Sequence, residues 1–149
     1  MEIDKAKAIA EQVVNRLTAH CQRIEVAGSI RRRRPEVHDI DLVLIPSDRD
    51  AVDRILMQVG KIKMSGLKIA RVTMESIELD VYYATPETWA TLLLVRTGSE
   101  QFNRMLANRA LKRGLKLKAG GQGVMRGLDV IASESEEQIL GALGLPYLG

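Results

Sequence analysis

The sequence is poor in cysteine and in long apolar runs, and each shortage excludes a class of protein. A single cysteine, Cys21, excludes a disulfide framework and a cysteine-rich zinc site and fits a reducing compartment. The longest apolar stretches, such as Leu42 to Ile45 and Leu92 to Val95, are far shorter than the roughly 20 residues that a membrane span requires. The N-terminus is charged and amphipathic, so we expect no signal peptide, a cytoplasmic location and no membrane partner.

Aromatic residues are also scarce, at only 3% of the chain. Stacking of bases on aromatic side chains would therefore contribute little to any binding of nucleic acid. The apolar fraction of 46% is still enough to bury a core. A chain of 149 residues then forms one domain of ordinary size, or two small lobes.

Positive charge is concentrated in one segment rather than spread along the chain. The segment from Arg96 to Lys118 holds seven of the 22 basic residues and one of the 19 acidic residues, Glu100. The rest of the chain is slightly acidic, with 15 basic and 18 acidic residues. A solvated helix face would explain the segment by itself, whereas binding of nucleic acid or phosphate is the more specific interpretation.

Periodicity and helix-breaking residues predict alternating helices and strands up to residue 85. The expected elements are a helix over 4–20, a strand over 23–27, an arginine-rich helical turn that Pro35 stops, a strand over 39–45, a helix over 48–59, and strands over 67–73 and 76–83. The last two strands are joined by a tight turn at Met74 to Ser76.

After Pro86 the pattern becomes mainly helical, which indicates a second lobe. The expected elements are helices over 87–96 and 100–113, separated by the helix-stop and helix-start signal Thr97-Gly98-Ser99, then short strands up to about Ile131 and a helix over 135–143. The sequence therefore predicts an α+β fold with lobes at 1–85 and 86–149.

Three aspartates are candidate metal ligands. Asp39 and Asp41 alternate with apolar residues on one strand, so their carboxylates project from the same face, and Asp80 projects from the polar face of another strand. Two metal ions that align a hydroxyl with a leaving pyrophosphate need clustered carboxylates. The alternative is that Asp39 and Asp41 are ordinary solvent-facing strand residues.

The turn at Gly28-Ser29 is a candidate phosphate site. It lies between a strand and a helical turn, where backbone N–H groups lack intrahelical partners and glycine allows a close approach. Of the four arginines Arg31 to Arg34, one or two can face this junction, where guanidinium groups match phosphate geometry. A solvated turn is the alternative interpretation.

Taken together, these motifs resemble the polymerase X family, the group that contains DNA polymerase beta. Gly28-Ser29, Arg31-Arg32, Asp39-Ile40-Asp41 and Leu79-Asp80-Val81 are similar to the family's palm. Thr97-Gly98-Ser99, Phe102-Asn103 and Ala110 to Leu115 are similar to its nucleotide-binding thumb, and Glu136 to Tyr147 resembles the end of bacterial and archaeal members. The resemblance covers nearly the whole chain and implies a nucleotidyltransferase palm with a mixed β-sheet flanked by helices, plus a small thumb.

The resemblance also implies roles for individual residues. Asp39 and Asp41 would bind two magnesium ions, for which manganese could substitute, and Asp80 would bind the catalytic ion and act on the primer 3′-hydroxyl. Gly28, Ser29 and Arg32 would hold the β- and γ-phosphates. Thr97 and Gly98 would lie near the sugar, and Asn103 would reach the base edge. The basic thumb, with Arg104, Asn108 and Lys112 at four-residue steps on an exposed face, would grip DNA.

The sequence also departs from the family pattern. It has no counterpart of the lyase domain or of the helix-hairpin-helix DNA clamps, so we expect no lyase activity, and we expect partner repair proteins to supply the DNA-clamp functions. Glu78 stands where polymerase beta has an arginine, two residues before the third aspartate. Val95-Arg96 replaces the aromatic pair that discriminates between sugars, and Ala107 replaces a template-contacting arginine.

These features predict a minimal, monomeric polymerase of this family that adds dNTP or NTP to a primer terminus of primer-template, gapped or end DNA, in repair. One alternative is a template-independent nucleotidyltransferase of the same superfamily. Another is an accessory module that binds nucleic acid without useful turnover.

Overall fold

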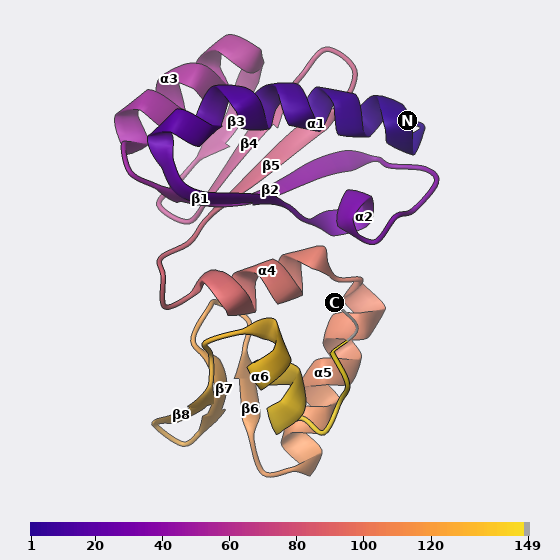
Figure 1. The fold of residues 1–149 in the computed structure, drawn as a ribbon, viewed down its shortest axis with the longest axis vertical. Coiled ribbons are helices and arrows are strands. Elements are labelled where there is room, and N and C mark those ends of the chain that lie inside the picture. The colour runs from indigo at the N-terminus through magenta and orange to yellow at the C-terminus, as the bar shows by residue number, and fades with distance from the viewer. Residues whose placement is uncertain (148–149) are drawn as a thin grey trace. The chain divides into compact units, whose positions relative to one another are not determined.

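The computed structural model describes residues 1–147 and divides the chain into two compact units. The first comprises Met1–Ala84 and the second begins at Thr85, one residue before the predicted boundary. Figure 1 shows the elements of both units. Each unit has its own cluster of buried apolar side chains, so each is described by itself.

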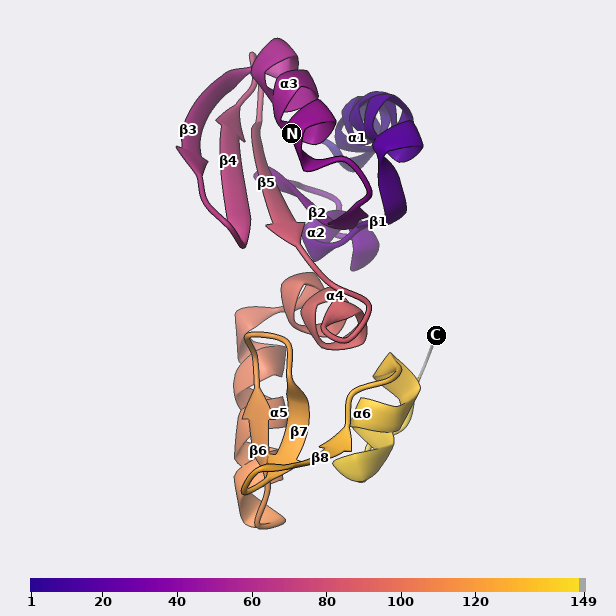
Figure 2. The same ribbon diagram turned by 90° about the vertical axis from the view of Figure 1, so that its left-hand side faces the viewer.

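The first unit is a five-stranded mixed sheet with two long helices on one face (Figure 2). Along the chain its elements are α1 (Ile3–Leu17), η1 (Thr18–His20), β1 (Cys21–Val26), α2 (Gly28–Arg31), β2 (Asp39–Pro46), α3 (Arg49–Val59), β3 (Lys61–Ser65), β4 (Ile69–Thr73) and β5 (Glu78–Tyr83). Asp48 caps α3, since its side chain accepts a hydrogen bond from the Ala51 N–H at 3.1 Å.

The strand order is β1-β2-β5-β4-β3. The central strands β2 and β5 run parallel, and the other neighbouring pairs are antiparallel. Alternate residues of the two central strands, such as Leu42, Leu44, Leu79 and Val81, are fully buried in the cluster that includes residues of α1 and α3. Since successive strand residues point to opposite faces, the intervening residues of β2 and β5 face away from this core.

The second unit packs three helices with a three-stranded antiparallel sheet of order β6-β7-β8. Its elements are α4 (Trp89–Thr97), α5 (Glu100–Lys112), β6 (Lys116–Lys118), β7 (Gly123–Arg126), β8 (Asp129–Ala132) and α6 (Glu136–Ala142). Ser99 and Ser135 cap α5 and α6 by accepting hydrogen bonds from the Phe102 and Gln138 N–H groups at 3.2 and 3.0 Å. Leu106, Val124 and Ile139 are fully buried in the core.

The predicted α+β fold with a mixed sheet is therefore confirmed, and the ends of the predicted elements shift by only a few residues. Strand β3 was not predicted. It is an edge strand with mostly exposed residues, including Lys61 and Lys63, so it lacks the apolar side chains that mark a strand in a sequence. Among the described residues, no helix is both long enough and apolar enough to cross a membrane.

Close packing between α3 and the β3–β4 hairpin gives a test of the fold of the first unit. A Cβ atom at Gly60 would lie 2.5 Å from the Thr73 carbonyl oxygen and 2.8 Å from Val72 Cγ1. Because one of these neighbours is backbone, we expect Gly60→Ala to lower the free energy of unfolding by about 1 to 3 kcal/mol. Thermal unfolding would measure the loss.

Gly66→Ala is the matched control, because its nearest atom would lie at 3.5 Å, an ordinary contact. This variant should unfold at the wild-type temperature or slightly above it. Equal unfolding temperatures for the two variants would contradict the packing described here.

Candidate active site

The parallel register of β2 and β5 brings the three predicted aspartates onto one face of the central sheet. Asp41 lies directly opposite Asp80, and Asp39 lies two residues before Asp41 on the same strand. This face is the one that points away from α1 and α3, because Ile40, Leu42 and Leu79 occupy the core side. Three carboxyl groups from two neighbouring strands therefore form one acidic cluster.

Gly28 lies against this cluster. It has a φ of 62°, and a Cβ atom at this position would lie only 2.0 Å from Asp41 Oδ2. The Ala27 N–H also donates a hydrogen bond to the Asp41 carbonyl oxygen at 2.8 Å. Glycine is thus required here for both its backbone conformation and its small size, and the turn that carries Ser29 follows immediately after the contact.

Asp41 is the carboxyl group that the cluster perturbs most. Burial raises its pKa from 3.8 to about 7, and the neighbouring carboxyl groups of Asp39 and Asp80 contribute to the rise. A hydrogen bond shared with Asp39 acts in the same direction, while the guanidinium group of Arg32 lowers the pKa. Without a counter-ion the cluster therefore tends to retain a proton near neutral pH.

Arg32 follows the last residue of α2, and its guanidinium group lowers the pKa of Asp41. Arg32, Arg33 and Arg34 are exposed, and Arg31 is half-buried. Gly28, Ser29 and Arg32 thus lie on the turn that follows the contact with Asp41, and their role in phosphate binding stays a prediction.

Arg71 is a residue of this region that the sequence reasoning missed. It lies directly opposite Asp80 on β4, and its Nε is 3.2 Å from Asp80 Oδ1. Burial raises the pKa of Asp80, and the Arg71 guanidinium opposes that rise. The predicted turn at 74–76 would pair residue 71 with residue 79, whereas the observed register pairs Thr73 with Glu78 and therefore Arg71 with Asp80.

Glu78 takes part in a separate ion pair. Its carboxylate lies 2.5 Å from Lys63 Nζ, and the hydrogen bond from this lysine holds the pKa of Glu78 below its ordinary value. Where the resemblance leads one to expect an arginine on β5, the structure therefore has a glutamate paired with a lysine, and the arginine next to Asp80 comes from β4 instead.

The donor chemistry of the cluster suits a hard divalent cation, since it consists of carboxylate oxygens whose mutual repulsion a cation would relieve. Within residues 1–147, however, no group of three or more His, Cys, Asp or Glu side chains is already arranged to hold a metal ion. Asp80 is paired with Arg71, and Asp41 with Asp39.

The predicted sugar and base contacts lie at the junction of α4 and α5 in the second unit. Thr97 Oγ1 donates a hydrogen bond to the Leu93 carbonyl at 2.7 Å, and Gly98 has a φ of 66° and a cis peptide bond to Ser99. Asn103 Nδ2 donates to the Val95 carbonyl at 2.8 Å. Its Oδ1 is buried and accepts no hydrogen bond from the described residues. Such an acceptor is suited to a donor from a ligand.

The predicted DNA contacts lie on one exposed face of α5. Arg104, Asn108 and Lys112 are all exposed, and Arg104 pairs with Glu100 one turn earlier at 2.6 Å. An exposed pair of this kind contributes little to stability, so the arginine can exchange its partner for a phosphate. The predicted residues thus form two groups, one in each unit.

Comparison with known proteins finds a family match in the second unit and a relative along nearly the whole chain. Residues 92–149 match the model of the DNA polymerase beta thumb family. Along 98% of its length the chain is also 27% identical to the DNA polymerase/3'-5' exonuclease PolX of Bacillus subtilis (strain 168), of which it spans 27%. The chain thus resembles the polymerases of family X, and the predicted resemblance is confirmed.

The carboxyl cluster should make the stability of the protein depend on pH. The pKa of Asp41 is raised in the folded state, so the folded protein keeps a proton that the unfolded chain releases between about pH 4 and pH 7. Stability from this group is therefore lost as pH rises through that interval. We expect Asp41→Asn to raise the free energy of unfolding at pH 8 by about 1 to 2 kcal/mol, with little effect at pH 4.

Denaturant unfolding without divalent cations at the two pH values would measure this difference. Glu75→Gln, at an exposed position in the turn between β4 and β5, serves as the control and should keep the wild-type pH dependence. An Asp41→Asn variant that is less stable than the wild type at pH 8 would refute the raised pKa.

Removal of Arg71 should leave the carboxylate of Asp80, whose side chain is 11% exposed, without its guanidinium partner. We expect Arg71→Ala to raise the pKa of the Asp80 carboxyl further and to lower the free energy of unfolding at pH 8 by about 1 kcal/mol. Carbon-13 NMR titration of the carboxyl groups would follow the first effect, and denaturant unfolding the second.

Lys63→Ala is the matched control, because it removes the lysine of the neighbouring Lys63–Glu78 ion pair. In that pair the lysine side chain is more exposed than the glutamate side chain. This variant should change stability by less than about 0.5 kcal/mol and leave the titration of Asp80 as it is in the wild type. If both variants shifted that titration equally, Arg71 would have no specific role.

Proposed function

We propose that this protein is a minimal polymerase of family X, which transfers a nucleotidyl group from dNTP or NTP to the 3′-hydroxyl of a DNA primer. The observation that carries the proposal is the acidic cluster of Asp39, Asp41 and Asp80 with the Gly28-Ser29 turn packed against it. The thumb match in the second unit supports the same activity. The nucleotidyltransferase palm is part of this proposal.

In the proposed reaction the primer 3′-oxygen forms a bond to the α-phosphorus, the bond from this phosphorus to the bridging oxygen breaks, and pyrophosphate leaves. The hydroxyl proton must pass to an acceptor, and Asp80 is proposed to act there. Its pairing with Arg71 would hold one carboxylate oxygen in place.

Asp39 and Asp41 are proposed to hold two divalent ions, with Asp80 as a further ligand of one of them. Magnesium, or manganese in its place, would supply positive charge for the phosphoryl oxygens. Neutralisation of the cluster would also release the proton that the raised pKa of Asp41 retains near neutral pH.

Ser29 and Arg32 are proposed to bind the β- and γ-phosphates. The hydroxyl and the guanidinium group are both donors, and Arg32 lies close enough to the cluster to lower the pKa of Asp41. Gly28 would serve this site through the absence of a side chain, because any Cβ would displace the Asp41 carboxylate.

In the second unit, Thr97 and Gly98 are proposed to contact the sugar, and Asn103 the base edge. The buried Oδ1 of Asn103 supports this role, since a donor from the ligand would satisfy it. Arg104, Asn108 and Lys112 are proposed to bind DNA phosphates, so affinity should fall steeply with salt. A role in gap or end repair, with partner proteins supplying the missing clamps, completes the proposal.

Primer extension tests the proposal directly. The wild-type chain would be incubated with magnesium, a labelled primer, and dNTP or NTP, on gapped, end and single-stranded DNA. Asp80→Ala should abolish extension while the variant still binds DNA and nucleotide. Asp50→Asn, an exposed position on α3 away from the cluster, should extend primers as the wild type does.

The alternatives predict other results. Equal extension with and without a template would indicate a template-independent nucleotidyltransferase. DNA binding without extension in any metal would indicate an accessory module, which the lack of a ready-made ligand group in the described residues would favour. Extension by Asp80→Ala at the wild-type rate would overturn the assignment of the catalytic carboxylates.

A further inference from the structure

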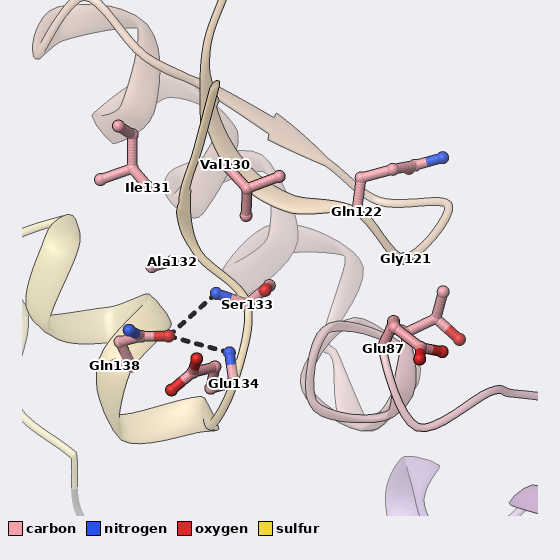
Figure 3. Close-up of a pocket in the computed structure, with 10 residues that line it drawn as sticks. Glu87, Gly121, Gln122, Val130, Ile131, Ala132, Ser133, Glu134 and Gln138 are labelled. Atoms are coloured by element: carbon pink, nitrogen blue, oxygen red, sulfur yellow. Dashed lines mark hydrogen bonds between the residues drawn. The ribbon is translucent and has the colours of Figure 1, made fainter. Parts of the chain in front are cut away.

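The second unit contains a pocket of about 490 Å³ that no part of the proposed polymerase reaction uses (Figure 3). Its size lies within the range of about 300 to 1,000 Å³ that is usual for ligand sites. Ten residues of the loop before α4, the β6–β7 connection, β8 and the start of α6 line it: Glu87, Thr88, Gly121, Gln122, Val130, Ile131, Ala132, Ser133, Glu134 and Gln138. The pocket is therefore built within one unit.

The pocket follows β8, which is an edge strand. In the part of the chain that the structure describes, β7 is the strand next to β8 and no strand lies on its other side. Val130 to Glu134 line the pocket consecutively, although successive strand side chains project to opposite faces. Figure 3 shows Val130 and Ile131 projecting to different sides of the chain. A ligand touching all of these residues would have to lie along the strand.

The backbone at the end of this strand is held in place. Gln138 Oε1 accepts hydrogen bonds from the Ser133 and Glu134 N–H groups at 3.0 and 2.8 Å, as Figure 3 shows. The strand itself exposes apolar side chains, with Val130 at 53% and Ile131 at 38% exposure, and Leu128 in the turn just before it is 97% exposed. An extended and fixed edge that exposes apolar residues can accept another strand.

The acidic residues around the pocket favour a partner strand that carries positive charge. Glu87 and Glu134 line it, and the segment 127–140 carries four acidic residues and no lysine or arginine. The basic residues of this unit are concentrated in the segment from Arg96 to Lys118, which includes α5 and β6. The field at the pocket therefore repels a phosphate backbone and attracts cationic side chains.

We propose that the edge of β8 and its pocket form a docking site for an extended, basic segment of a partner protein. The segment would add a fourth strand to the small sheet, place its apolar side chains beside Val130, and direct lysine or arginine toward Glu87 and Glu134. Backbone hydrogen bonds would supply affinity, and the charge would select the partner. The docking site does not depend on the nucleotidyl transfer proposed above.

The test uses the whole chain, labelled with nitrogen-15, and an acetylated, amidated heptapeptide in which lysine alternates with valine. We expect the peptide to shift the amide signals of residues 129–134 and of Gly121 and Gln122. Reversal of charge in Glu134→Lys should weaken binding by about tenfold. Val130→Lys should weaken it as well, with the remaining amide spectrum unchanged as proof of folding.

Two controls separate strand addition from attraction of charge alone. Leu67→Lys adds the same single positive charge as Val130→Lys, but at a 90% exposed apolar residue of the first unit. This variant should bind the peptide as the wild type does. The same heptapeptide with every backbone nitrogen methylated keeps its charge but has no backbone N–H to pair as a strand, so it should not bind.

Several outcomes would overturn the proposal. These are equal binding of the methylated peptide, wild-type affinity in Glu134→Lys and Val130→Lys, or shifts confined to residues outside the pocket.

Signals of β8 that move with protein concentration would instead make this edge an interface between copies of the chain. Signals that move on addition of a DNA oligonucleotide would assign it to nucleic acid. Primer extension by Val130→Lys at the wild-type rate would show that docking and catalysis are separate.

Discussion

The parallel pairing of β2 with β5 is the constraint on which the rest of the first unit depends. It places Asp41 next to Asp80, and it buries Leu42, Leu44 and Leu79 on the other face of the same strands. If either strand slipped by one residue, its apolar side chains would leave the core and its carboxylates would enter it. The free-energy cost of burying a charge excludes that arrangement. The packing of the core thus fixes the register, and the register in turn assembles the acidic cluster.

The sequence predicted what depends on local pattern. Alternating Asp39, Ile40 and Asp41 defined both a strand and its polar face, and the serine before α5 marked a helix start that the structure retains. Pairings between distant segments were harder to predict. Arg71 lies outside the motifs, and its ion pair with Asp80 depends on the exact register of the hairpin that joins β4 to β5. Strand β3 was not predicted because its pairing with β4, rather than an apolar pattern of its own, holds it in the sheet.

The two units differ in how they use polar groups. In the first unit, the carboxyl groups repel one another, and they lie against Gly28, where no side chain would fit. In the second, the polar groups are mostly satisfied by caps and turns, with the Oδ1 of Asn103 as a buried acceptor that lacks a partner among the described residues. Proteins generally tolerate repelling or unpaired polar groups where a ligand pairs with them. The acidic cluster with Gly28 and the Oδ1 of Asn103 both belong to residues that the proposal assigns to the nucleotide and its metal ions.

The separation of charge inside the second unit has a consequence for how this unit would approach a nucleic acid. Helix α5 packs beside β6, at one edge of the small sheet, whereas the acidic segment runs from β8 at the other edge into the start of α6 (Figure 1). The unit therefore carries an electric dipole moment in addition to its net charge. In the field of a polyanion this dipole experiences a torque, so the unit would be turned with α5 forward and β8 away from the DNA before any contact forms.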